Sequence, residues 1–159
     1  MPSDAHVMQI LSKVKDPEIP VLTVEDLGII RSVEIQDAKV IVTITPTYSG
    51  CPAMDVIEKE ILAAFRHDDM KAEVLTALSP AWTTDWISEN GKKKLLEAGI
   101  VPPQGSASKL SLLKDEPTLT CPKCKSENTQ IVSQFGSTAC KALHKCNECL
   151  EPFEYFKCL

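Results

Sequence analysis

The chain has 159 residues, enough for one large domain or two small ones. Hydrophobic residues make up 43% and charged residues 25%, which is typical of a soluble globular protein and excludes collagen-like, mucin-like and wholly disordered classes. The net charge of -5 argues against a nucleic-acid partner, because such binding needs clustered Lys and Arg. No apolar run reaches the ~18 residues of a membrane span, and no secretory signal is visible. We therefore expect a cytoplasmic protein with no membrane partner.

The first part of the chain predicts a helix followed by a β-hairpin. Ser3 or Asp4 can cap the helix, and Pro17 follows its end. The helix is indicated by apolar residues at helical spacing: Val7, Ile10, Leu11 and Val14. After an acidic loop, apolar and polar side chains alternate along 29–36 and 39–45, which predicts two strands joined at Asp37-Ala38.

A second helix, a third strand and a third helix are expected next. Cys51-Pro52 opens the second helix, since proline suits the first helical position. Residues 72–78 predict the third strand, and the third helix begins near Thr83 or Thr84 and closes at Gly99. The predicted fold class is α+β: a small helix-strand-strand-helix-strand-helix domain with a mixed three-stranded sheet, followed by a small all-β zinc ribbon. We place the first domain at 1–100, a proline-containing linker at 101–118 and the ribbon at 119–159.

The expected topology brings three loops to one end of the sheet. A hairpin is antiparallel, so its first strand starts where its second strand ends. The strand-helix-strand unit that follows is parallel and right-handed, so the third strand ends there too. We expect convergence of the loops at 16–28, 46–52 and 79–86, and α/β proteins often bind ligands at such loops.

Six of the seven cysteines lie in the last 39 residues. Without an export signal, metal binding or catalysis is a better explanation for them than disulfides. Two Cys-x-x-Cys units have the spacing of a four-thiolate site: Cys121, Cys124, Cys146 and Cys149. A segment of about 40 residues with few large apolar side chains also needs such a staple to fold. Zinc is favoured, although iron or an iron-sulfur cluster accepts the same ligands.

The remaining cysteines and His144 have less specific signals. Cys140 and Cys158 are either small buried hydrophobes or further metal ligands. His144 is expected on a ribbon strand rather than on the metal. Cys51 stands at a helix N-terminus, where the helix dipole stabilises a thiolate, and its loop is expected to meet the acidic loop. A helix-start cysteine of no consequence is the alternative.

These residues carry a resemblance to known families. The first part resembles the iron-sulfur cluster assembly domain of SufT-like proteins and of some Mrp-type carriers, through three motifs: residues 16–18 (DPE), 24–28 (VEDLG) and 47–52 (TYSGCP). The whole chain resembles the PaaD family, also called PaaJ, through three more: residues 80–87 (PAWTTDWI), 135–142 (FGSTACKA) and 151–158 (EPFEYFKC).

The resemblance implies an accessory role and two sites. PaaD proteins are encoded with the multicomponent phenylacetyl-CoA epoxidase of aerobic phenylacetate degradation and are not its oxygenase. The implied role is maturation of a di-iron or iron-sulfur centre, with the epoxidase subunits or their reductase as partners. A candidate assembly site would comprise Cys51, Asp16, Glu18 and Asp26. Two alternatives remain: a structural or regulatory epoxidase subunit, and a thiol oxidoreductase using Cys51. A homo-oligomer is also left open.

Overall fold

The computed structural model describes residues 2–104 and 118–157. It divides into two compact units. The front unit comprises the described residues up to Trp82 together with Trp86–Ser88, and the ribbon unit comprises Thr83–Asp85 and the described residues from Glu89 onward. Cys158 and most of the expected linker lie outside the described residues. Within these ranges, no helix is both long and apolar enough to cross a membrane.

The front unit contains a mixed three-stranded sheet, as predicted. Its strands are β1 (Ile30–Gln36), β2 (Lys39–Ile44) and β3 (Lys71–Thr76), in the order β1-β2-β3. β1 pairs antiparallel with β2, and β2 pairs parallel with β3. Asp37 and Ala38 both have positive φ, which matches the tight two-residue turn that the twist of a hairpin favours.

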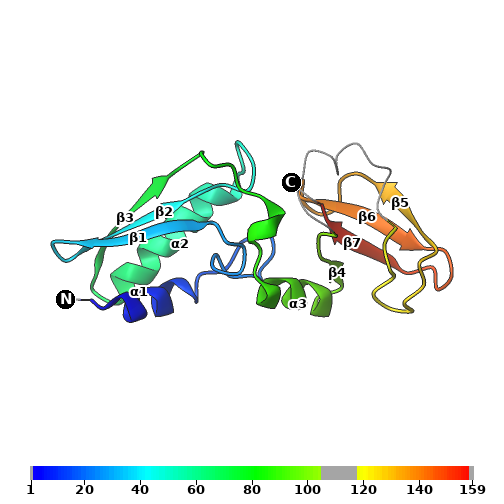
Figure 1. Cartoon of the computed structure of the whole chain (residues 1–159), viewed down its shortest axis with the longest axis horizontal. Helices are drawn as coiled ribbons and strands as arrows, with labels where there is room; N and C mark the ends of the chain where they lie inside the picture. Colours follow the sequence, from blue (N-terminus) through cyan, green and yellow to red (C-terminus); the bar gives the residue numbers. More distant parts are fainter. Residues whose placement is uncertain (1, 105–117, 158–159) are drawn as a thin grey trace. The chain divides into compact units, whose positions relative to one another are not determined.

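Two helices complete the front unit. Ser3 caps α1 (Asp4–Leu11) by accepting a hydrogen bond from the His6 amide, and α2 (Ala53–His67) lies along one face of the sheet (Figure 1). α2 buries residues at helical spacing and β2 buries alternate residues, so the core contains Ile57, Ile61, Phe65, Val40, Val42 and Ile44. Burying each such side chain stabilises the fold by roughly 1.5–3 kcal/mol.

The predicted convergence of three loops agrees with the strand register. Ile44 at the end of β2 lies opposite Ile30 at the start of β1 and opposite Thr76 at the end of β3. Beyond the strands, the Thr45 amide donates to the Ile29 carbonyl at 2.8 Å, and the Ala77 amide donates to the Ile44 carbonyl at 2.9 Å. The three loops therefore leave the sheet at one end.

The third helix begins later than predicted. A 3₁₀ turn occupies Thr84–Trp86, and α3 runs over Glu89–Glu97. The expected start near Thr83 fails because the Ser88 amide donates to the carbonyl of Asp26 instead of joining a helical ladder. The predicted end is confirmed by the positive φ of Gly99.

The ribbon unit has a four-stranded sheet in the order β4-β7-β6-β5. The strands are β4 (Ile100–Val101), β5 (Thr129–Ser133), β6 (Lys141–Cys146) and β7 (Pro152–Phe156). The last three agree with the all-β ribbon that the sequence predicts over 119–159. β4 pairs parallel with β7, and α3 contacts β4. α3 and β4 therefore belong with the ribbon, whereas we expected the first domain to run to residue 100 and a linker to begin at 101. Helical spacing shows that a helix has an apolar face but not which body buries it.

Candidate metal centre and assembly loop

The four predicted thiols of the ribbon come together. The sulfur atoms of Cys121, Cys124, Cys146 and Cys149 all lie within 4.8 Å of one another. Cys121 and Cys149 are 3.7 Å apart, and Cys124 and Cys146 are 3.5 Å apart. A tetrahedron with metal–sulfur bonds of ~2.3 Å has sulfur–sulfur edges of ~3.8 Å. The arrangement thus has the dimensions of a four-thiolate metal site.

Two turns with matching geometry hold these thiols. The Cys121 amide donates to the Ser126 carbonyl at 2.8 Å, and the Cys146 amide donates to the Glu151 carbonyl at 3.0 Å, so each turn closes five residues after its first cysteine. The residue after each second cysteine has positive φ, namely Lys125 and Leu150. This conformation is uncommon for residues other than glycine. The two Cys-x-x-Cys segments are therefore structural repeats of one knuckle.

Polar contacts join the two knuckles. The side chain of Asn147 donates to Asn128 at 2.9 Å, and Lys123 forms an ion pair with Glu151 at 2.9 Å. An exposed ion pair adds little stability, so the main effect of these contacts is on the register of the two knuckles. Motif spacing offers no signal for these pairs, because their partners lie 19 and 28 residues apart in the sequence.

Two of the four thiols have pKa values shifted in opposite directions. Burial raises the pKa of Cys121, but hydrogen bonds from the amides of Cys124 and Lys123 and from the thiols of Cys149 and Cys124 outweigh it and lower the pKa to about 7. At Cys149 the Glu151 amide lowers the pKa, while burial and the other three thiols raise it to about 12. Thiolates are the metal-binding form of cysteine, so the lowered pKa of Cys121 favours binding of a cation.

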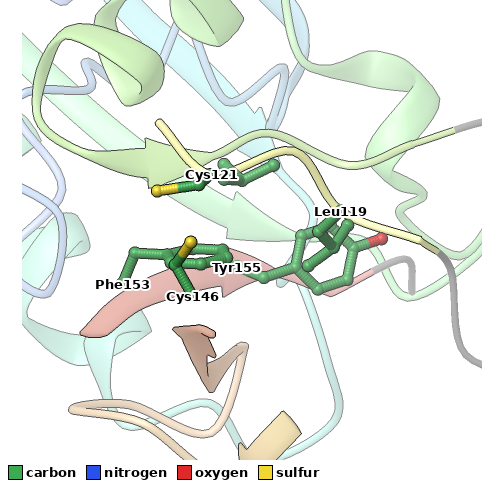
Figure 2. Close-up of a cluster of buried hydrophobic side chains, with 6 residues drawn as sticks. Leu119, Cys121, Cys146, Phe153 and Tyr155 are labelled. Atoms are coloured by element: carbon green, nitrogen blue, oxygen red, sulfur yellow. The ribbon is translucent and has the colours of Figure 1, made fainter. Parts of the chain in front are cut away.

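The core of the ribbon is built around two of the four thiols. Its buried cluster contains Val101, Leu119, Cys121, Cys146, Phe153 and Tyr155. Figure 2 shows Phe153 and Tyr155 on β7 near Cys146, together with Leu119 and Cys121 from the segment that precedes β5. The donor set, its spacing and its burial all suit a structural metal ion. Bound there, such an ion would cross-link the two knuckles through four thiolates.

His144 and Cys140 are not members of this group. His144 lies on β6 and is buried, with its ring stacked on Phe153 at 5.8 Å and edge-on to Tyr155 at 5.9 Å. This agrees with its expected place on a ribbon strand. The Cys140 sulfur is also buried and lies 3.0 Å from the Thr138 hydroxyl. Both side chains are buried within the ribbon unit.

In the front unit, Cys51 is half-buried where its loop enters α2. Gly50 has a φ of 77°, and the Cys51 amide donates to the Tyr48 carbonyl at 3.2 Å. The N-cap residue, Pro52, makes no side-chain cap hydrogen bond. Cys51 therefore directly precedes a helix whose first turn has no side-chain cap, and the free amides of that turn carry partial positive charge.

Two of the predicted carboxylates, those of Asp16 and Asp26, accept hydrogen bonds from amides of the acidic loop. Asp16 and Asp26 are both buried. Asp16 Oδ1 accepts from the amides of Glu18 and Ile19 at 2.8 and 2.7 Å, and Asp16 lines a cavity of about 420 Å³ between residues 13–20 and α2. Over residues 2–104 and 118–157, only the ribbon thiols form a group close enough to share an ion. The grouping of Cys51 with Asp16, Glu18 and Asp26 remains a prediction.

Two family models match this chain, one in its first part and one in its last part. Residues 4–76 match the family model of the iron-sulfur cluster assembly protein, and residues 105–157 match that of the PaaD zinc β-ribbon domain. The front unit also resembles a solved domain of unknown function, DUF59, from Bacillus anthracis. That match has a TM-score of 0.54 and 23% identity, and covers 58% of this chain and 90% of the other. It supports the fold alone.

Two relatives are similar in sequence. An Escherichia coli K12 protein, which its name assigns provisionally to the 1,2-phenylacetyl-CoA epoxidase as one of the subunits, is 44% identical over 160 residues, covering 99% of this chain and 95% of the relative. A Porphyromonas gingivalis protein named Fe-S protein maturation auxiliary factor is 33% identical over 104 residues, covering 62% of this chain and 93% of the relative. Because the first match is nearly end to end, this chain belongs to the PaaD family and joins an iron-sulfur cluster assembly domain to a PaaD zinc β-ribbon domain.

Proposed function

We propose that this protein is an accessory factor that helps to assemble a metal centre of the phenylacetyl-CoA 1,2-epoxidase system. The observation that carries the proposal is the nearly full-length similarity to the E. coli relative that is named as part of the epoxidase. The similarity of the front part to a protein named Fe-S maturation auxiliary factor supports a role in assembly. The client would be an epoxidase subunit or its reductase, and the delivered group an iron-sulfur cluster or a di-iron centre.

In this proposal the two units have different tasks. The front unit provides Cys51 as the sulfur that contacts the delivered iron, with Asp16, Glu18 and Asp26 around the same end of the sheet. The ribbon holds zinc through Cys121, Cys124, Cys146 and Cys149. Zinc has no redox chemistry, so its part is to hold the ribbon together. Cytoplasmic maturation would suit reduced thiols.

The test of Cys51 is a maturation assay in cells. The epoxidase subunits are co-produced with the wild-type chain, with Cys51→Ser or with Ser49→Ala, a change in the same loop that keeps the thiol. We expect Cys51→Ser to yield client protein at normal levels but with little iron, whereas Ser49→Ala should yield iron-loaded client. A client with full iron occupancy beside Cys51→Ser would contradict the proposal.

Purification of the intact system distinguishes a permanent subunit of the epoxidase from a factor that binds it only transiently. An assembly factor acts substoichiometrically, so its ratio to the client should fall through successive columns. A structural or regulatory subunit would instead stay at a fixed ratio, a result that the name of the E. coli relative makes worth testing. Turnover of a thiol substrate that is lost in Cys51→Ser would favour an oxidoreductase.

Metal content tests the identity of the ribbon ion. After anaerobic purification, we expect about one zinc ion per chain, because four thiolates in a closed tetrahedron are typical of structural zinc. Iron at that ratio, removed by Cys124→Ser, would show that the ribbon carries iron instead.

A further inference from the structure

Both tryptophans of the chain lie in a short stretch that is fastened to the start of β1. We call Trp82 and Trp86–Ser88 the tryptophan segment; all of these residues belong to the front unit. The Trp82 indole donates to the Leu27 carbonyl at 2.8 Å. The Ser88 amide donates to the Asp26 carbonyl at 2.9 Å, and the Ser88 hydroxyl donates to Asp26 Oδ1 at 3.3 Å.

Two further contacts need a close approach of the same segments. A Cβ added to Gly28 would lie 2.2 Å from the Trp86 carbonyl oxygen, so only glycine lets the two backbones come this close. The Arg31 guanidinium carbon lies 3.8 Å from the centre of the Trp86 ring, a cation–π distance. Residues 26–31 therefore hold the tryptophan segment through hydrogen bonds, backbone packing and a stacked cation.

The carboxylate of Asp26 accepts hydrogen bonds from two residues of the front unit. Its Oδ2 accepts from the Thr23 amide at 3.1 Å, and its Oδ1 accepts from Ser88. The Asp26 amide in turn donates to the Thr23 hydroxyl at 3.1 Å. Asp26 is only 5% exposed, and a buried charge needs such partners. A role in metal binding would require it to give up donors that hold the loop.

Residues 26–31 are hydrogen-bonded to the beginning of the loop that carries Cys51. Ile29, one residue after Gly28, accepts a hydrogen bond from the Thr45 amide at 2.8 Å. Thr45 directly follows β2 and begins the stretch that leads to Cys51. A displacement of residues 26–31 would therefore pass to the origin of that loop.

We propose that Asp26 is a positioning residue: its carboxylate clasps the tryptophan segment to residues 26–31, and this clasp sets the origin of the loop that carries Cys51. Asp26 thus acts through Thr23 and Ser88 and not as an iron ligand. The consequence for Cys51 chemistry rests on the proposed function, whereas the clasp itself does not.

The two tryptophans report on the clasp in the full-length chain without added iron. We expect Asp26→Ala and Ser88→Ala to shift tryptophan emission to longer wavelength and to increase quenching by acrylamide, because the segment becomes more exposed. Glu25→Ala is the matched control: it removes an exposed carboxylate from the neighbouring position and should leave both signals unchanged. Asp26→Asn keeps an oxygen acceptor and should restore most of the wild-type signal.

A second measurement follows the rate of Cys51 alkylation by peptide mass spectrometry. The rate should change in Asp26→Ala and return toward the wild-type value in Asp26→Asn. Emission and quenching like the wild type in Asp26→Ala would overturn the clasp, and an unchanged alkylation rate would overturn its link to Cys51. If Asp26→Ala does not fold, Ser88→Ala decides, since it removes one hydroxyl. Cys51→Ser should leave emission unchanged, so failure of the maturation assay is distinguishable from failure of the clasp.

Discussion

Removing the metal from the ribbon should unfold the ribbon unit while the front unit stays folded. The perturbation is a strong chelator added to the full-length chain, with metal analysis to show complete removal. Two of the six residues in the buried cluster of the ribbon, Cys121 and Cys146, are themselves proposed ligands. Without an ion, a ribbon that stayed folded would still bury these sulfur atoms but would lose the bonds that hold the knuckles together.

The magnitude follows from a comparison of two free energies. Metal binding to small four-ligand domains contributes about 10–16 kcal/mol at neutral pH, whereas a whole domain is net stable by about 5–15 kcal/mol. The other four cluster residues, Val101, Leu119, Phe153 and Tyr155, each contribute roughly 1.5–3 kcal/mol by burial. Loss of the metal should therefore exceed the stability that remains in the ribbon.

Hydrogen exchange followed by mass spectrometry is the direct assay. Amides in β5, β6 and β7 should lose protection, and amides in β1, β2 and β3 should keep it. Circular dichroism gives a second measure: the eight residues of α1 and the fifteen of α2 stay helical, and at most the nine of α3 are lost. Tryptophan emission should not change, because both indoles belong to the front unit.

Protection of β5–β7 that survives demonstrated metal removal would refute this reasoning. A pair of cysteine variants controls for nonspecific damage. Cys124→Ser removes an exposed ligand and should abolish stoichiometric metal binding, whereas Cys140→Ser alters a buried thiol outside the four-thiol group and should retain it. Metal loss in both variants would mean that packing around the thiols, and not ligation, determines occupancy.

Three further predictions concern stability, each measured by denaturant unfolding. Gly28→Ala should cost about 2–4 kcal/mol, because it combines positive φ with a clash on Trp86; Gly50→Ala has positive φ but open space and should cost only about 1 kcal/mol, so equal losses would contradict the clash. Ala38→Gly should stabilise the hairpin by roughly 1 kcal/mol, since Ala38 has a φ of 64°; a loss would contradict that turn. Burial raises the pKa of Glu154, but hydrogen bonds from Ser137 and the charge of Lys141 outweigh it and lower the pKa below its ordinary value, so its contribution to stability is present above the ordinary pKa and is lost as pH falls through the lowered one. Glu154→Gln should therefore be less stable than the wild type at neutral pH and should converge with it in acid.

Much of the fold follows from local patterns. Alternation along β2 and helical spacing along α2 identify the buried residues, because one face of each element must leave water. The spacing of the two Cys-x-x-Cys units likewise predicts the metal centre, since each turn can offer two sulfurs to one ion. The structure agrees with the predicted buried face of β2 and brings the four thiols together, while metal binding by these thiols remains a prediction.

The remaining features depend on contacts across the chain. The start of α3 moves to Glu89 because Ser88 bonds to Asp26, 62 residues earlier, and no periodicity reports such a partner. The acidic loop shows the same limit: Asp16 and Asp26 look like metal ligands by residue type, yet their oxygens accept hydrogen bonds from Ile19, Thr23 and Ser88. Composition identifies a carboxylate but not the donors that surround it.

The place of β4 has a consequence for any attempt to isolate the ribbon. β7 is flanked by β6 on one side and by β4 on the other, and β4 precedes the stretch that matches the ribbon family model, 105–157. A fragment cut at 105 would expose one edge of β7, and bare strand edges recruit strands from other molecules. A fragment that starts before Glu89 would keep α3 and β4 together with the ribbon. We expect such a fragment to stay monodisperse.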